Sequence, residues 1–166
     1  SRFSWLLLHL ICAMTAAYVI SLFQVQIEQL VVLAVLMPVV ATMGGAASVQ
    51  ALTVSVRGIA MKEVTPSNTI RTIGKETMVG LLNGFIFALM ISIISWFWFG
   101  SVALGAVIAM AIIINLFVAG LSGSALPILL QKMGYDPAVA SSAFLTSITD
   151  IVGFYVFLGL GAIVLL

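Results

Sequence analysis

The chain has 166 residues, of which 63% are hydrophobic and only 7% are charged, with a formal net charge of +1 at pH 7. This balance is far from that of a soluble domain and indicates an integral membrane protein. We expect a lipid bilayer as its surroundings and no nucleic acid as a partner.

The apolar runs predict an all-α membrane protein. A hydrocarbon core about 30 Å thick takes about 20 apolar residues as a helix, so the chain divides into five spans with short connections. We predict these spans at residues 3–22, 30–56, 78–99, 102–130 and 138–166, from the apolar runs and the breakers that flank them. The runs are continuous rather than alternating, which argues against a β-barrel. Residues 1–166 are therefore expected to form one transmembrane domain.

Basic residues fall before the first span, between the second and third, and between the fourth and fifth, which is one side of a five-span map. They are Arg2, Arg57, Lys62, Arg71, Lys75 and Lys132. Because cytoplasmic connections carry the excess of Lys and Arg, we predict a multi-pass protein of the inner (plasma) membrane. Its amino end is predicted to be cytoplasmic and its carboxyl end periplasmic or extracellular. Trp96 and Trp98, on the opposite side, are typical interfacial anchors.

The sequence begins directly at a span without an initiating Met or a signal pattern, so we expect further segments upstream. The polar stretch 57–78 is a cytoplasmic connection and a candidate docking surface for them. Within it, Ser67 is placed to cap a helix that runs through Lys75 and Glu76 into the third span. His9 and Cys12, in the first span, are interpreted as packing residues.

Asp150 is the only acidic or basic residue in the apolar run from Pro137 to Leu166. An acid at bilayer depth costs about 2.5–3.5 kcal/mol, so it usually faces a partner, a cavity or an ion path. Its neighbours at helical spacing are small and polar: Ser142, Thr146, Ser147 and Gly153. We predict that this stripe contacts water or hydrated ions. The alternative is an aspartate that hydrogen-bonds to another helix, for instance to Asn115 or to a hydroxyl.

The second span contains a run of small residues and helix breakers at 38–50, including Pro38, Gly44 and Gly45. Such a run is tolerated in a membrane where neighbouring helices or a watery cavity satisfy the freed backbone groups. Close packing of helices through small residues is the alternative. Both interpretations can hold for different faces of the same helix.

Over essentially its whole length the sequence resembles the MgtE magnesium channels. The resemblance rests on four motifs in the family's order and spacing: Gly44 and Gly45 within 38–50; Lys75, Glu76, Val79, Gly80, Leu81, Leu82 and Gly84; Gly134, Asp136, Pro137 and Ala138; and Thr149, Asp150, Gly153 and Tyr155.

The resemblance implies a homodimer of five-helix subunits with a pore on the two-fold axis, lined by the second and fifth spans of both subunits. It implies that Asp150 binds hydrated Mg²⁺, and it makes Gly45, Val49, Thr53, Ser142 and Thr146 pore-lining residues. It also implies cytoplasmic regulatory domains ahead of the first span, an acidic helical domain and a pair of CBS modules. Mn²⁺, Co²⁺ and Ni²⁺ are further candidate ions.

One motif departs from the family pattern. Where the family has Gly-Gly-Asn-x-Gly-Asn-Gln, Ala46 and Val49 replace two amides and Ser48 replaces a glycine. If Val49 lines the inner pore, as the residue it matches does, this end of the pore is drier.

Magnesium also fits the residues chemically. Mg²⁺ loses its water reluctantly, so it keeps several waters and needs few carboxylates. Two copies of Asp150 on a two-fold axis would face such a hydrated ion. The main competitor is a proton-coupled divalent cation carrier in which Asp150 accepts a proton. A membrane anchor for the upstream part is a further alternative. We do not expect an enzyme, because the sequence has none of the usual catalytic motifs.

Overall fold

The structure is a computed structural model that describes the backbone of residues 2–135 and 137–165 and the side chains of residues 2–135 and 144–165. This part of the chain contains helices and no strands: α1 (Arg2–Ser21), α2 (Gln24–Gln29), α3 (Val31–Ala60), α4 (Thr69–Phe99), α5 (Val102–Lys132) and α6 (Pro137–Leu165). Five of them are long and apolar enough to cross a membrane, namely α1, α3, α4, α5 and, within α6, Phe144–Leu165. The predicted all-α fold with five spans is confirmed.

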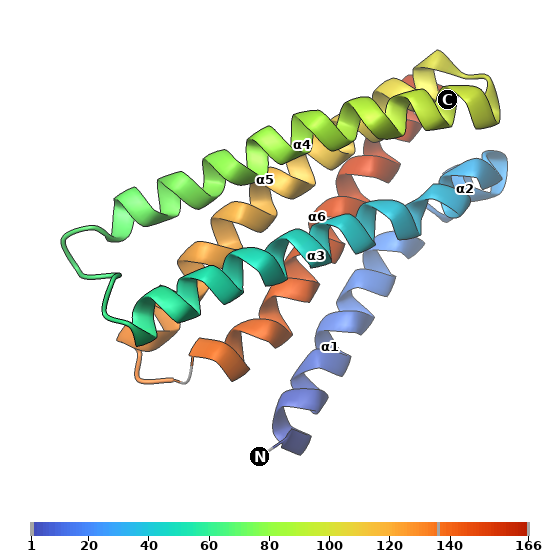
Figure 1. Cartoon of the computed structure of the whole chain (residues 1–166). Helices are drawn as coiled ribbons and strands as arrows, with labels where there is room; N and C mark the ends of the chain where they lie inside the picture. Colours follow the sequence, from blue (N-terminus) through green and yellow to red (C-terminus); the bar gives the residue numbers. More distant parts are fainter. Residues whose placement is uncertain (1, 136, 166) are drawn as a thin grey trace.

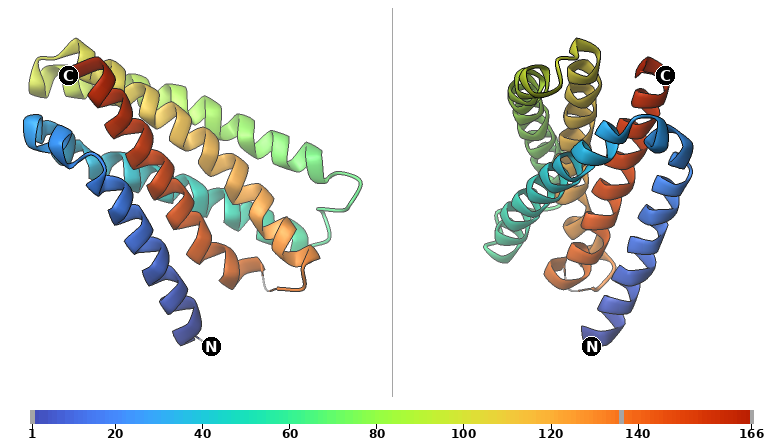
Figure 2. Two further views of the ribbon diagram at one scale, coloured as in Figure 1. Left: turned by 180° about the vertical axis from the view of Figure 1, so that it is seen from behind. Right: turned by 90° about the vertical axis from the view of Figure 1, so that its right-hand side faces the viewer.

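The helix α5 forms the centre of the bundle. It packs against α4, α6 and α3, whereas α1 packs on α6 (Figure 1). Figure 2 shows α1 at one margin of the bundle and α4 at the other. The core is built from apolar side chains of α5, among them Ile108, Ala111, Ile112 and Leu116, with Leu33 and Leu36 from α3 and Phe157 and Leu158 from α6. A helix surrounded in this way is apolar on all sides, as α5 is.

The helices alternate in direction, so their connections gather at two ends (Figure 1). The start of α1 and the connections α3–α4 and α5–α6 lie at one end. The short helix α2, the α4–α5 turn and the end of α6 lie at the other. The basic residues therefore share one end of the bundle, as the charge pattern predicts.

The polar stretch between the second and third spans is mostly helical. α3 continues without a break past Pro38 to Ala60, and α4 begins at Thr69. The prediction that Ser67 caps α4 is wrong: the N-cap is Asn68, and its side chain is used within the connection. Its amide nitrogen donates to the Glu63 carbonyl at 2.8 Å, and its Oδ1 accepts from the Thr65 N–H at 2.7 Å.

The turn from α4 to α5 is tight. Gly100 has a φ of 67°, a left-handed conformation that glycine adopts without strain, and its N–H donates to the Trp96 carbonyl at 2.8 Å. Ser101 then caps α5, because its hydroxyl accepts a hydrogen bond from the Leu104 N–H at 3.1 Å. Trp96 and Trp98 are exposed beside this turn.

Candidate ion site

One face of α3 is closed against its neighbours. Gly44 is buried, and a Cβ added to it would overlap the Asn115 side chain of α5. One turn further along, Ser48 is fully buried. A Cβ on Gly123 of α5 would lie 2.8 Å from the Ser48 carbonyl oxygen and 2.7 Å from Cβ of Ala51. The small residues on this face are therefore packing residues that let two backbones approach closely.

The adjoining face of α3 is open. Gly45, Val49 and Thr53 are spaced by four residues and share this face. A Cβ on Gly45 would meet nothing within 4 Å, and 51% of the Val49 side chain is exposed. Thr53 is also exposed, and its hydroxyl donates to the Val49 carbonyl at 2.8 Å. The structure thus places these three residues together, on a surface that its single chain leaves uncovered.

Asn115 of α5 joins α3 and α6 at the centre of the bundle. It is 1% exposed, and its Nδ2 donates to the Val40 carbonyl of α3 at 3.0 Å. A Cβ on Gly153 of α6 would lie 2.9 Å from the same nitrogen. Two glycines, Gly44 and Gly153, therefore make the space that this amide occupies. Its Oδ1 is buried, and no donor among the described residues reaches it.

Asp150 lies on the side of α6 that faces α3. It shares a face with Gly153, Phe157 and Gly161, all of them buried. A Cβ on Gly153 would lie 3.1 Å from Val40, and one on Gly161 would lie 2.9 Å from Leu33, both of α3. Asp150 itself is only partly buried. Asp150 therefore lies in the middle of the span, on the side of α6 that also carries these contacts with α3, and is incompletely covered.

Asp150 makes no hydrogen bond in the described part of the chain. In the described part of the chain no hydrogen bond joins Asp150 to Asn115, whose amide nitrogen donates to the Val40 carbonyl. The group that acts on Asp150 electrostatically is the imidazole of His9, on α1. Sequence reasoning treated His9 as a packing residue only. Its place on the half-buried stripe Trp5, His9, Cys12 and Ala16, where α1 meets α6, is the signal that could have found it.

The remaining predicted pore residues lie on α6. Thr146 is partly buried one turn before Asp150, and Ser147 beside it is 7% exposed. The side chain of Ser142 lies outside the described residues. Thr149 is fully buried, with its hydroxyl donating to the Leu145 carbonyl at 3.0 Å. Of the hydroxyl residues near Asp150, Thr146 is therefore partly exposed like Asp150, whereas Ser147 and Thr149 are buried in the bundle. In the described residues no group of three or more His, Cys, Asp or Glu side chains could hold a metal ion.

The fold and this site together define a multi-pass helical membrane protein that carries an acidic residue in the middle of one of its spans. The chain belongs to the MgtE family of divalent cation transporters, whose family model matches residues 37–160. The matched region includes the run at 38–50, Asn115 and Asp150.

Curated relatives extend the match to nearly the whole chain. The Magnesium transporter MgtE of Enterococcus faecalis is 35% identical over 161 residues, 97% of this chain and 36% of its own length. The protein of the same name from Bacillus subtilis is 33% identical over 159 residues, 96% of this chain and 35% of its own length. A third, from Thermus thermophilus, is 27% identical over 165 residues. The chain therefore spans about a third of the length of these relatives.

Proposed function

We propose that this chain is the membrane part of a Mg²⁺ channel, and that two copies form the pore at a two-fold axis. The pore is lined by the open face of α3, with Gly45, Val49 and Thr53, and by the Asp150 side of α6 with Thr146 and Ser142. The ion passes as hydrated Mg²⁺ and is held by the Asp150 pair. The names of the relatives support magnesium as the transported ion.

The observation that carries this proposal is the setting of Asp150. It is an acid at mid-span that faces α3, is incompletely covered and has no hydrogen bond in the described part of the chain. A lone carboxylate facing lipid is costly, so it requires water, an ion or a partner at this place. The uncovered face of α3 beside it offers a glycine and a hydroxyl, which suit a wet surface better than a lipid-facing one.

The chemistry of Mg²⁺ fits such a site. The ion holds its water shell tightly and is usually bound through one or two carboxylates. Two copies of Asp150 supply two negative charges without displacing the waters. A dry site for Ca²⁺ would need six to eight oxygen ligands, which a pair of single carboxylates does not offer. A two-fold axis is the commonest symmetry of homo-oligomers.

The orientation follows from the basic end of the bundle. The last turns of α3 and α5, which carry Arg57 and Lys132, lie at the same end of the bundle as the start of α1 (Figure 1). We expect this end to face the cytoplasm, because cytoplasmic connections carry the excess of basic residues. Regulatory domains preceding α1 would then reach the connection at residues 61–68 directly. The greater length of the relatives is the support for such domains.

The test is Mg²⁺ influx into liposomes that contain the purified chain, compared with its Asp150→Asn and Asp150→Glu variants. We expect the Asn variant to lose influx while it stays folded, and the Glu variant to retain part of it. Thr15→Val, on an exposed face of α1, is the matched control and should leave influx unchanged. Unchanged influx in the Asn variant would contradict the proposal.

A proton-coupled carrier is the second candidate, and the observation that favours it is the packing of α1, which carries His9, on α6, which carries Asp150. Carboxylate and imidazole groups together form proton relays in pumps and transporters. The same liposomes separate the two functions. A channel passes Mg²⁺ at equal rates with and without a pH gradient, whereas influx that requires the gradient, and is lost in His9→Gln, indicates the carrier.

A further inference from the structure

A second group of polar side chains lies on the opposite side of α3 from Gly45 and Val49. Both α3 and α4 pack on α5, but they do not pack closely on each other. A hollow of about 230 Å³ opens between them, above Gly120 of α5. Its polar lining residues come from two helices: Gln50 from α3, and Glu76 and Asn83 from α4.

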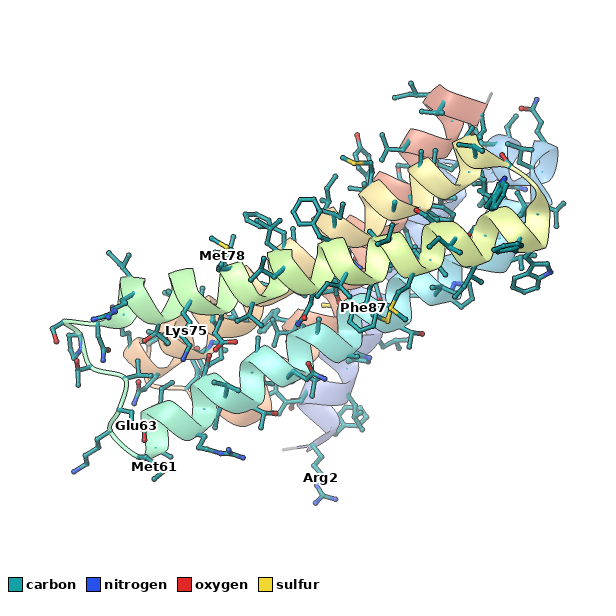
Figure 3. All side chains as sticks on the ribbon, turned by 45° about the horizontal axis from the view of Figure 1, so that its top comes forward. Arg2, Met61, Glu63, Lys75, Met78 and Phe87 are labelled. Carbon is teal, nitrogen blue, oxygen red and sulfur yellow. The ribbon has the colours of Figure 1, made fainter. Side chains whose placement is uncertain are left out.

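The three polar residues are held on rigid elements. Glu76 and Asn83 are seven residues apart, which places them on one face of α4, two turns from each other. Phe87 continues this face and points toward α3 (Figure 3), where it lines a separate apolar hollow with Val39 and Met43. Gly120 of α5 packs against the backbone of Glu76, since a Cβ added to Gly120 would lie 2.6 Å from the Glu76 carbonyl oxygen. The backbone that carries Glu76 is therefore fixed against α5.

None of the three side chains has a hydrogen-bond or ion-pair partner in the described part of the chain. Lys75 comes next to Glu76 in sequence, but adjacent residues of a helix do not face each other. Polar groups within a membrane span must be satisfied by protein, water or a ligand, because lipid offers no partner. An amide as deep as Asn83, more than three turns into α4, therefore indicates that the hollow is filled.

The donor set defines the class of ligand. A carboxylate and two amide carbonyls are hard oxygen ligands, which are the ligands that Mg²⁺ and similar cations prefer. The single negative charge of Glu76 excludes an anion. The volume leaves room for a shell of water, since one water takes about 30 Å³ in the liquid.

We propose that this hollow binds one hydrated divalent cation through Glu76, Gln50 and Asn83, at a site separate from Asp150. The type of ion rests on the proposed function, whereas the existence of the site rests on the hollow and its unpaired oxygens. Glu76 lies two turns from the start of α4, near the basic end of the bundle, so the ion is held near that end. The site lies across α3 from the proposed pore face and is separate from it.

Binding of Mn²⁺, followed by electron paramagnetic resonance on the detergent-purified chain, tests this site without any measurement of transport. The Asp150→Asn variant removes the pore site and should keep one class of bound Mn²⁺. Adding Glu76→Gln keeps an oxygen but removes the only negative charge of the site, and should weaken that class at least about tenfold, the size of effect that loss of a group supporting a metal commonly has. Mg²⁺ should displace the Mn²⁺. Glu63→Gln removes an acid from the exposed connection instead and should change nothing.

Asn83→Leu is a second variant that leaves the charge in place, and it should also weaken binding. The proposal is overturned if Asp150→Asn alone removes all bound Mn²⁺, or if Glu76→Gln binds as tightly as its parent. It is also overturned if Glu76→Gln dissociates the oligomer by light scattering, because a second copy would then fill the hollow. A normal Mg²⁺ influx in Asp150→Asn would contradict the pore and leave these binding results unaffected.

Discussion

The two faces of α3 are both built from small residues, yet they meet different surroundings. Gly44 and Ser48 are buried against α5, where an added methyl group would collide with another helix. Gly45 and Val49, each one position further along, face open space. A shift of one residue is about 100° around a helix, which is enough to separate a packing face from an uncovered one. Small residues in a membrane helix therefore serve two purposes that composition alone does not distinguish.

The largest effect is expected when the pH is lowered, because protonation of Asp150 should abolish Mg²⁺ binding at the proposed pore. The proposed pore site depends on the carboxylate of Asp150, and a carboxylate must be deprotonated to bind a metal. Mg²⁺ affinity should therefore hold near neutral pH and fall steeply toward about pH 4, where aspartates protonate. Isothermal titration across this range measures it. An affinity that is unchanged down to pH 4 would count against Asp150 as the ligand.

The next largest difference is expected in stability, when a methyl group is added to the packed face and to the open face of α3 in turn. Gly44→Ala pushes against Asn115, which its hydrogen bond to Val40 holds in place, so we expect a loss of about 1–3 kcal/mol in the free energy of unfolding. Gly45→Ala is the matched control and should be neutral or stabilising by up to about 1 kcal/mol. Denaturant titration in detergent micelles compares the two. Equal losses would mean that both faces are packed.

Removing the central amide should cost less. Asn115→Ala deletes one interhelical hydrogen bond and leaves a small cavity, for a loss of about 1 kcal/mol. Ser92→Ala removes a comparable bond, from the Ser92 hydroxyl to the Gly105 carbonyl at 3.0 Å, between α4 and α5. Because α4 lies away from Asp150, only the Asn115 variant should also weaken Mg²⁺ binding. If Asn115→Ala and Ser92→Ala weakened Mg²⁺ binding equally, the expectation that Asn115 supports the Asp150 site would be contradicted.

The smallest structural change is expected on the open face. Val49→Asn restores the amide of the family pattern and should raise Mg²⁺ influx, because it makes the inner pore wetter. Stability should change by less than about 0.5 kcal/mol, since the side chain is exposed. Val54→Asn, also exposed but beside the α3–α4 hollow, is the control for influx. Influx lowered by Val49→Asn would contradict the predicted role of this position.

The five spans could be predicted from the sequence, because apolar length is a local signal. Asp150 could be singled out for a similar reason, since a lone acid in an apolar run is visible without the fold, but its role stays a prediction. The sequence of the 38–50 run allows two interpretations, a helix-packing face and a face that contacts water. Only the packing of α3 against α5 shows which residues are buried and which are uncovered. The place of Asn115 could not be predicted for the same reason. It donates a hydrogen bond to Val40, which lies far away in the chain, and periodicity carries no information on such pairs.

The helix caps show a similar limit at short range. Ser67 and Asn68 are both good N-cap residues, so composition did not choose between them. The choice is made by the bonds of Asn68 to Thr65 and Glu63, which fold the connection back on itself. The short helix α2 was also not predicted. It is six residues long and has no apolar periodicity to reveal it.

The most direct test of the central claim is whether water and ions reach the open face of α3. In a Cys12→Ser background, Val49→Cys should react with a charged, membrane-impermeant thiol reagent, lose Mg²⁺ influx on reaction, and be protected by Mg²⁺. Leu89 on α4 is even more exposed, at 65% against 51% for Val49. Leu89→Cys should not react, because we expect lipid to cover it. If Val49→Cys is as unreactive as Leu89→Cys in liposomes that show Mg²⁺ influx, the open face of α3 does not line a pore, and the proposed channel is contradicted.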